Sequence, residues 1–191
     1  MSSYIFNTRA ELDTGIADWV EDKEAAIKQY GDINTWDVSA ITDFSSLFLW
    51  GWDLYAYKFN SDISSWDVSN GTDFSRMFSK TIFNQDISGW DVSNGTDFSY
   101  MFAGNRSFNQ DIGNWNVGNG TTFEQMFYEA TSFNKDLNGW DISKGDLNKI
   151  FYGATSFNGD ISNWDVSRET DFSGMLSGAS AFNQDIGNWD V

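Results

Sequence analysis

The sequence predicts an α/β repeat solenoid, with short parallel strands on one face, short helices on the other, and a helical cap at its N-terminus. The main observation is a periodic series of tryptophans, which after one longer step are 24 or 25 residues apart: Trp36, Trp66, Trp90, Trp115, Trp140, Trp164 and Trp189. Nearly the same text surrounds each of them, as in residues 83–98 and again from Phe108 and from Phe182. A fixed period in this range is typical of stacked coils. Residues that recur are therefore interpreted first as packing residues.

Each unit is expected to contain one short strand. Residues 87–94 read Ile-x-x-Trp-x-Val-x-Asn, which is the pattern of a leucine-rich repeat. In such a strand Trp90 and Val92 would point inward while Asp91 points outward.

Each unit is also expected to contain one short helix after the strand. Residues 94–95 are Asn-Gly and predict a tight turn, and Thr96 is a suitable N-cap. Apolar residues then follow at helical spacing, namely Phe98, Met101 and Phe102.

Residues 1–35 do not repeat and are interpreted as an N-terminal helical cap. Thr8 and Glu11 form a capping box at the start of one predicted helix, and a second helix is expected over residues 22–30, with Gly31 after its end. Residues 36–191 are interpreted as six coils plus a final strand, forming one continuous unit with the cap.

The repeated motif Phe-Asn-x-Asp-Ile-x-x-Trp-Asp-Val-Ser resembles the BspA-like leucine-rich repeat of bacterial surface proteins, over residues 33–191. The resemblance implies a cell-surface or extracellular binding or adhesion protein. It departs from the family pattern Val-Thr-Asp-Met at two positions: Gly replaces the Val and Phe replaces the Met. These positions are Gly71, Gly95 and Gly120, and Phe74, Phe98 and Phe123. The paired exchange is expected to conserve core volume.

Composition excludes several functions. The net charge is -17 and the 11 basic residues are scattered, which disfavours nucleic acid and anionic membranes. The absence of His and Cys removes the commonest general base and thiol nucleophile, and the chain is predicted not to be an enzyme. No apolar run has the length of a membrane span. The N-terminal residues carry no signal-peptide pattern, so a virion or intracellular location is kept as an alternative.

Sixteen of the 28 acidic residues recur at three positions of the repeat. Stacked carboxylates repel one another, so they require either hydrogen bonds in turns and caps or a hard cation such as Ca²⁺. The candidate metal ligands precede the expected strand: Asp62, Asp86, Asp111, Asp136, Asp160 and Asp185. An asparagine column is expected to form an internal ladder with backbone groups: Asn60, Asn84, Asn109, Asn134, Asn158 and Asn183.

Two features are candidate ligand-binding surfaces. One is the outward face of the expected strands, which carries Asp67, Asp91, Asp141 and Asp165. The other is an insert in the first coil that could form a stacking platform for sugar or protein, or could instead fold over the cap helices. Its aromatic residues are Trp50, Trp52, Tyr55 and Tyr57.

Two functions follow from this interpretation. The first is a non-catalytic recognition module for a protein or glycan ligand. The second is a structural assembly component, such as a decoration or fibre protein, because the sequence ends at Val191 inside an expected strand and an open strand edge favours pairing with another chain.

Overall fold

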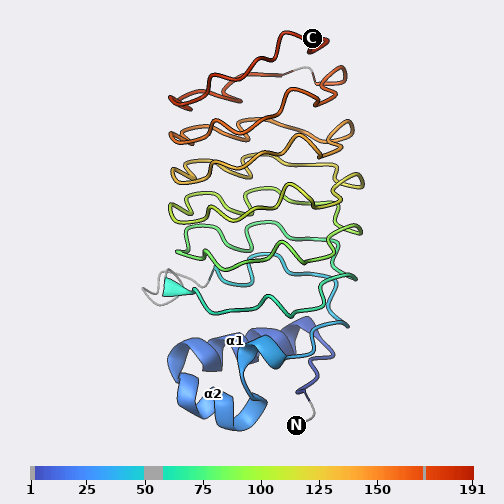
Figure 1. Ribbon diagram of the computed structural model, residues 1–191. Coiled ribbons are helices and arrows are strands. Elements are labelled where there is room, and N and C mark those ends of the chain that lie inside the picture. The colour runs from blue at the N-terminus through green and yellow to red at the C-terminus, as the bar shows by residue number, and fades with distance from the viewer. Residues whose placement is uncertain (1–2, 50–57, 170) are drawn as a thin grey trace.

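The computed structural model describes residues 3–49, 58–169 and 171–191. The chain forms a tall stack of similar coils that rises from a pair of N-terminal helices (Figure 1). The insert residues predicted to bind ligand, Trp50, Trp52, Tyr55 and Tyr57, lie outside the described residues.

The first helix, α1, spans Arg9–Glu21 and begins at the predicted capping box. The Thr8 side chain accepts a hydrogen bond from the Glu11 backbone N–H, and the Glu11 side chain accepts one from the Thr8 backbone. These bonds satisfy N–H groups that have no partner inside the helix. The apolar face of α1 is buried through Leu12, Ile16 and Trp19.

The second helix, α2, spans Lys23–Tyr30. The Asp22 side chain accepts a hydrogen bond from the Ala25 N–H at its start, and Gly31 ends it at φ 82°, where a residue without Cβ is not strained. A single 3₁₀ turn, η1, follows at Ile33–Thr35. The predicted start and end of this helix are confirmed.

The helices pack on the first coil through aromatic and polar contacts. The Trp36 ring lies 4.8 Å from Phe6 and 5.8 Å from Trp19, centroid to centroid. The Arg9 guanidinium contacts the Asp43 carboxylate at 3.1 Å. The apolar end of the coil stack is therefore covered on this side.

The predicted α/β fold class is wrong, because the described residues of the coils contain neither the strands nor the helices that it requires. In the part of the chain that the structure describes, the regular elements are α1, α2 and η1, and the β-type pairs between coils are isolated parallel bridges such as Asp73 with Asp97. Backbone hydrogen bonds, such as that from the Phe78 N–H to the Met101 carbonyl at 2.9 Å, also join successive coils. Where a strand was expected, the Trp90 N–H donates to the Ile87 carbonyl at 3.1 Å. This four-residue turn bends the chain just where a strand would need to be extended.

The expected helix is a series of tight turns. The Met101 N–H donates to the Phe98 carbonyl at 3.2 Å, and the Ala103 N–H to the Tyr100 carbonyl at 3.0 Å. Between these turns Tyr100 has φ 58°, and its N–H donates instead to Glu124 in the following coil at 2.9 Å. A left-handed residue interrupts an α-helix, although the apolar spacing fits both structures.

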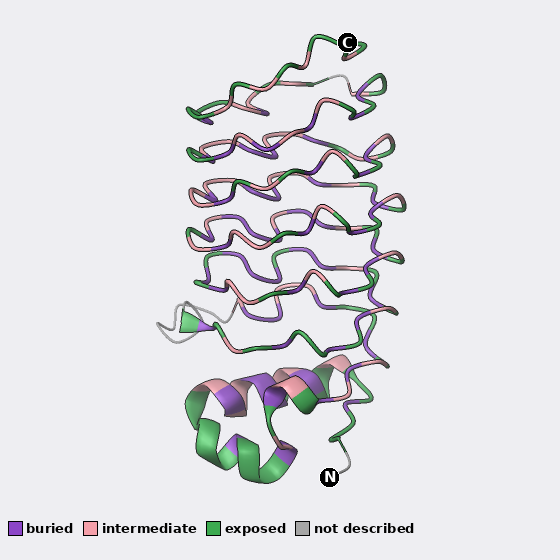
Figure 2. Ribbon diagram, viewed as in Figure 1, coloured by how far each residue is buried: buried purple, intermediate pink, exposed green. Residues whose placement is uncertain are grey.

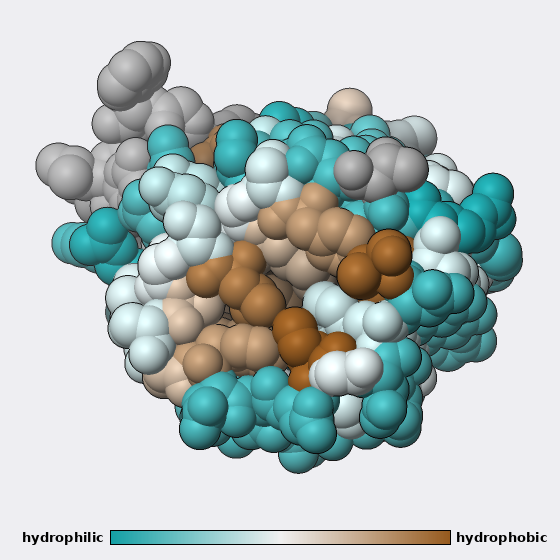
Figure 3. Space-filling view, turned by 90° about the horizontal axis from the view of Figure 1, so that it is seen from above, coloured by the Kyte–Doolittle hydropathy of each residue, from teal (hydrophilic) through white to brown (hydrophobic). Residues whose placement is uncertain are grey.

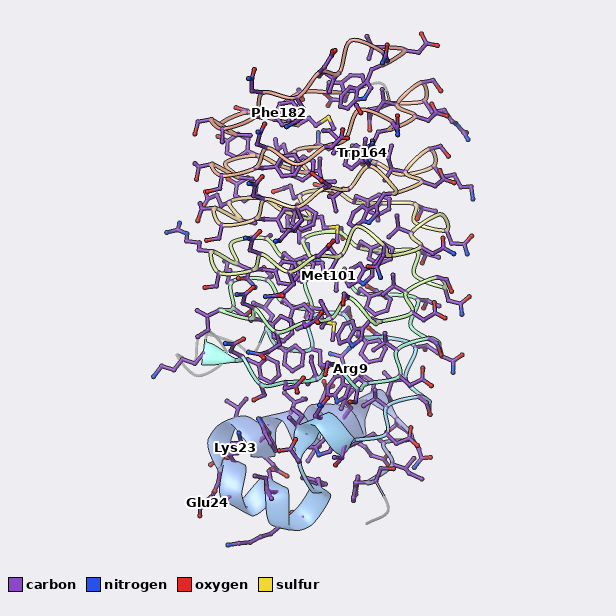
Figure 4. The ribbon with its side chains drawn as sticks, in the orientation of Figure 1. Arg9, Lys23, Glu24, Met101, Trp164 and Phe182 are labelled. Atoms are coloured by element: carbon purple, nitrogen blue, oxygen red, sulfur yellow. The ribbon has the colours of Figure 1, made fainter. Side chains whose placement is uncertain are left out.

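The coils are held in register by a row of tryptophans. Each indole N–H donates to the backbone carbonyl of the Ile or Leu at the start of the preceding coil, over 2.8–3.2 Å. The rings of Trp115 and Trp140 lie parallel, 6.5 Å apart. The donors are Trp66, Trp90, Trp115, Trp140, Trp164 and Trp189, and Figure 4 shows labelled Trp164 inside the stack.

Phenylalanine columns fill the rest of the interior. Successive rings of one column, from Phe48 to Phe151, lie 5.4–5.6 Å apart. Within a coil, Phe102 stacks on Phe108 at 3.9 Å. Figure 2 shows buried stretches at corresponding places in successive coils. The buried residues thus form one continuous core along the axis.

The predicted asparagine ladder is present, but it lies at the surface. The Asn84 N–H donates to the Asn60 Oδ1 at 2.8 Å, and the same bond recurs in the next four coils at 2.8–2.9 Å. The ladder side chains are half-buried or exposed. Their bonds to the backbone are as expected, whereas their interior position is not.

The exchange of Gly and Phe in the repeat has a direct steric basis. A Cβ added at Gly95 would lie 2.3 Å from the Phe98 Cζ and 3.0 Å from the Val92 carbonyl oxygen. The same conflict with the Phe three residues later exists at Gly71 and Gly120. The large ring occupies the space that a side chain at the Gly position would need.

Replacement of Gly95 by Val should lower the free energy of unfolding by about 1–3 kcal/mol, the usual cost of overpacking. Combination with Phe98→Met should recover at least half of that loss, because the shorter side chain leaves the space. Urea denaturation of both single variants and the double variant measures this coupling. Additive losses in the double variant would contradict the steric account.

Candidate functional site

The six proposed metal ligands are mostly engaged in turns. The Asp86 Oδ1 accepts the Ser88 backbone N–H at 2.9 Å, and Asp62, Asp111, Asp160 and Asp185 make the same bond two residues ahead. Asp136 accepts the Asp160 N–H at 2.9 Å. Among the described residues, no three acidic side chains come together as a metal-ligand set. The Ca²⁺ hypothesis stays a prediction, and hydrogen bonds supply the compensation that the carboxylates require.

The second acidic row forms an exposed line on the coil surface. Its members each accept the N–H of a Ser two residues ahead at 3.0–3.2 Å, and they are Asp67, Asp91, Asp141 and Asp165. In the fourth coil Asn116 takes this place and accepts the Gly118 N–H at 3.3 Å. The turn therefore forms with either a carboxylate or an amide. The negative charge of this row is available to a partner.

Hydrogen bonds from serine stabilise the ionised form of these carboxylates. The Ser93 hydroxyl, followed by the Ser93 backbone N–H, lowers the pKa of Asp91 below its ordinary value. Ser143 and Ser167 lower the pKa of Asp141 and Asp165 in the same way. Stabilisation of the charged form by donors explains the direction in each case.

A different set of side chains varies from coil to coil, and sequence reasoning missed it. It consists of the residues at left-handed φ in the tight turn that starts at a buried Phe or, in one coil, at Leu147, and we call it the left-handed ridge: Ser46, Arg76, Tyr100, Gln125 and Lys149, at φ 53–58°. Their positions in the repeat are equivalent, but their side chains are not. The only sequence signal was this variability inside an otherwise regular repeat.

A hollow of about 410 Å³ lies beside the ridge. Three ridge residues line it (Arg76, Tyr100 and Gln125), together with Lys80 and Glu129 of the next turn, the small residues Ser79, Ala103 and Gly104, and Leu49 and Tyr128. We call this hollow the tyrosine slot, after Tyr100 and Tyr128 in its lining.

Polar contacts hold the ridge side of the slot. The Gln125 Nε2 donates to the Tyr100 hydroxyl oxygen at 2.6 Å, and that hydroxyl donates to Glu124 at 3.1 Å. The Arg76 guanidinium lies 4.5 Å from the Tyr100 ring centre. Burial and the bond to Glu124 raise the pKa of Tyr100, so its hydroxyl is neutral at physiological pH.

A second hollow, of about 680 Å³, marks an irregularity in the repeat. The fifth coil has Gly145-Asp146 where the second has Gly-Thr-Asp. The Glu169 carboxylate reaches into this region and accepts the N–H groups of Leu147 and Asp171 at 2.9 and 3.0 Å. The hollow is thus largely explained by a one-residue deletion.

The end of the stack farthest from the helices is apolar. Figure 3 looks onto this end and shows hydrophobic side chains surrounded by a hydrophilic rim. Residues of the last coils that pack on the core but remain partly exposed are Phe172, Leu176, Phe182, Ile186 and Trp189. Their equivalents in earlier coils, such as Phe133 and Trp140, are buried.

Comparisons with known proteins identify a repeat family. The family model described as "Mycoplasma protein of unknown function, DUF285" matches residues 23–82, 58–146 and 145–191. No curated protein and no solved structure gives a significant match. Neither helix in the described part of the chain has the length and apolar character that a bilayer crossing requires.

The lowered pKa values predict loss of stability in acid. The pKa of these carboxyl groups is lower in the folded chain than in the unfolded chain, where it is 3.8 for Asp. Such a group stabilises the fold at any pH above its unfolded pKa, and this stabilisation is lost as the pH falls through its folded pKa. The melting temperature should therefore decrease from pH 5 to pH 2. The triple variant D91N/D141N/D165N should show a shallower decrease, because the amide accepts the same N–H at every pH.

Thermal melts at a fixed ionic strength measure both profiles. A melting temperature that rises on acidification would show instead that repulsion between carboxylates dominates.

Proposed function

We propose that this chain, which belongs to the DUF285 family of Mycoplasma proteins of unknown function, is a non-catalytic recognition module displayed at a cell surface. The family assignment rests on matches that together span residues 23–191. The repeated Trp-Asp-Val-Ser motif, which resembles that of BspA-like surface proteins, supports the surface location. The ligand is a protein or a glycan.

The observation that carries this proposal is the left-handed ridge. Left-handed φ costs a residue with a Cβ about 1–2 kcal/mol, whereas Gly adopts it without strain. Gly does occupy such positions in this chain, for example at Gly104, Gly153 and Gly174. The large residues Arg76 and Tyr100 therefore adopt this backbone conformation at a cost in free energy. Strain of this kind is concentrated where side chains serve a function.

The arrangement of constant and variable residues supports the same proposal. Buried Trp and Phe columns recur with little change, and the recurring Asp residues mostly satisfy the backbone N–H groups of their own turns. At the ridge the sequence changes from coil to coil while the backbone conformation stays the same. A constant frame that presents different side chains is suited to recognition.

Two matched surface variants test which face binds. In the ridge variant, R76S/Y100S/Q125S/K149S, each residue becomes Ser, which already occupies this left-handed position at Ser46. In the acidic-row variant, D67N/D91N/D141N/D165N, each residue becomes Asn, which already occupies this row at Asn116. Both variants should therefore fold.

Intact protein and both variants are applied to arrays of glycans and of extracellular proteins. We expect the intact chain to bind a subset of the array and the ridge variant to bind it at least tenfold more weakly. Loss confined to the acidic-row variant would move the site to the Asp67–Asp165 face. A chain that binds nothing on either array contradicts the recognition function.

A second candidate function, assembly, is favoured by the apolar end of the stack. Phe182, Ile186 and Trp189 are partly exposed and present an apolar face on which a further coil or another chain can pack. This would suit a structural component that packs end to end with another chain. Sedimentation velocity of the intact chain and of I186S/W189S tests it: concentration-dependent association that the variant lacks supports assembly, and a monomer at all concentrations opposes self-assembly.

A further inference from the structure

We infer that the tyrosine slot is a saccharide subsite, in which the pyranose ring of a carboxylate-bearing sugar stacks on the face of Tyr128. This inference rests on the recognition function proposed above and names its ligand class. It is carried by an interrupted tyrosine column, by the size of the slot, and by the charge of its rim.

A column of two stacked tyrosines lies next to the slot. Tyr128 and Tyr152 occupy equivalent positions in adjacent coils, and their rings stack at 5.0 Å with an angle of 5° between planes. One coil earlier this position is Ala103, and one coil before that it is Ser79. Within the described residues, no ring is stacked on the other face of Tyr128. In the described part of the chain the column therefore ends at Tyr128, which lines the slot.

The small side chain of Ala103 leaves space in front of that face of Tyr128, where the next two coils carry a tyrosine. The Lys80 side chain packs against the neighbouring Gly104, where an added Cβ would lie 3.2 Å from the Lys80 Cγ. The hollow of about 410 Å³ lies in the range of roughly 300–1,000 Å³ that small-molecule sites occupy. A six-membered ring placed over Ala103 would continue the column at the spacing that the two tyrosines already show.

Four of the ten residues that line the slot carry long polar side chains, namely Arg76, Lys80, Gln125 and Glu129, and their polar ends lie beside the apolar Leu49 and the aromatic rings. An aromatic side chain of a partner protein would need apolar walls on its edges, whereas the hydroxyl groups of a sugar would meet donors and acceptors there. The rim therefore favours a saccharide over an aromatic peptide.

The charge of the slot differs from that of the whole chain. The chain as a whole carries -17, but the slot is lined by two cations, Arg76 and Lys80, and by one carboxylate, Glu129. That carboxylate already has a partner, because Arg106 contacts it at 3.3 Å. Lys80 is exposed, so its ammonium is free to approach a ligand anion. A sugar carboxylate is the group that this local excess of positive charge would select.

The test uses acidic and neutral oligosaccharides of similar length. Hyaluronan tetrasaccharide and sialyllactose are the acidic probes, and chitotetraose and lactose are the neutral ones. We expect at least one acidic probe to bind the intact chain and to bind at least tenfold more tightly than its neutral counterpart in calorimetry.

Three variants locate the binding. Tyr128→Ala removes the stacking face and should weaken binding at least tenfold. Ala103→Tyr should do the same by filling the slot, and it should fold because the next two coils carry Tyr at this position. Tyr152→Ala is the matched control, because it removes a ring of the same column that does not line the slot, and it should change affinity less than threefold. Thermal melts confirm that each variant is folded.

The outcomes separate this inference from the recognition function. Acidic sugars that bind Ala103→Tyr as well as they bind the intact chain would overturn the subsite and leave recognition intact. If none of the four sugars binds but a protein ligand binds through the ridge, the subsite is also overturned and the recognition function stands. Absence of any ligand on sugar and protein arrays would overturn both proposals. A proline-rich or aromatic peptide displaced by Ala103→Tyr would identify the slot as a peptide site instead.

Discussion

The hydrogen bond from each tryptophan indole to the coil before it is the contact on which the structure depends. A buried indole N–H without a partner would cost the fold the desolvation of that group, so the ring must sit where the carbonyl of the preceding Ile or Leu can accept it. This requirement sets the distance between coils together with backbone hydrogen bonds such as that from the Tyr100 N–H to the Glu124 carbonyl. The Phe columns, the surface Asn ladder and the turns that carry the ridge all follow from the same register.

Much of this organisation could be predicted from the sequence, because residues that recur at a fixed spacing lie above one another in successive coils. The tryptophan period, the capping box at Thr8 and the Asn ladder were all predicted from recurring residues. The paired change at Gly95 and Phe98 was expected to conserve volume, and the structure shows the ring occupying the space beside the missing Cβ.

The secondary structure inside a coil could not be predicted in the same way. An i, i+3, i+4 pattern such as Phe98, Met101, Phe102 fits a helix, but it also fits consecutive four-residue turns. What separates the two is the left-handed φ of Tyr100, and nothing in the propensity of Tyr indicates that conformation. The ridge and the slot were missed for this reason, because they exist only where those turns point side chains outward.

The residues of a coil have two kinds of role. Core residues and turn-forming Asp residues repeat because every coil needs their side chains. Ridge residues differ because the fold depends on the conformation of their backbone and not on their side chains. Carboxylates at the surface keep the charge of the chain strongly negative, and the tyrosine slot carries a local excess of positive charge within it. Function is therefore assigned to departures from the repeat and not to the repeat itself.

Hydrogen exchange of the indole N–H protons, followed by NMR, tests the proposed register most directly. In the interior coils the indole protons of Trp66, Trp90, Trp115, Trp140 and Trp164 should exchange at least about 100-fold more slowly than in the unfolded chain, which corresponds to an opening free energy of roughly 3 kcal/mol. The half-buried Trp189 should exchange faster than these five. Indole protons that all exchange at the unfolded rate would contradict the account, because the bonds between coils could not then hold the stack together.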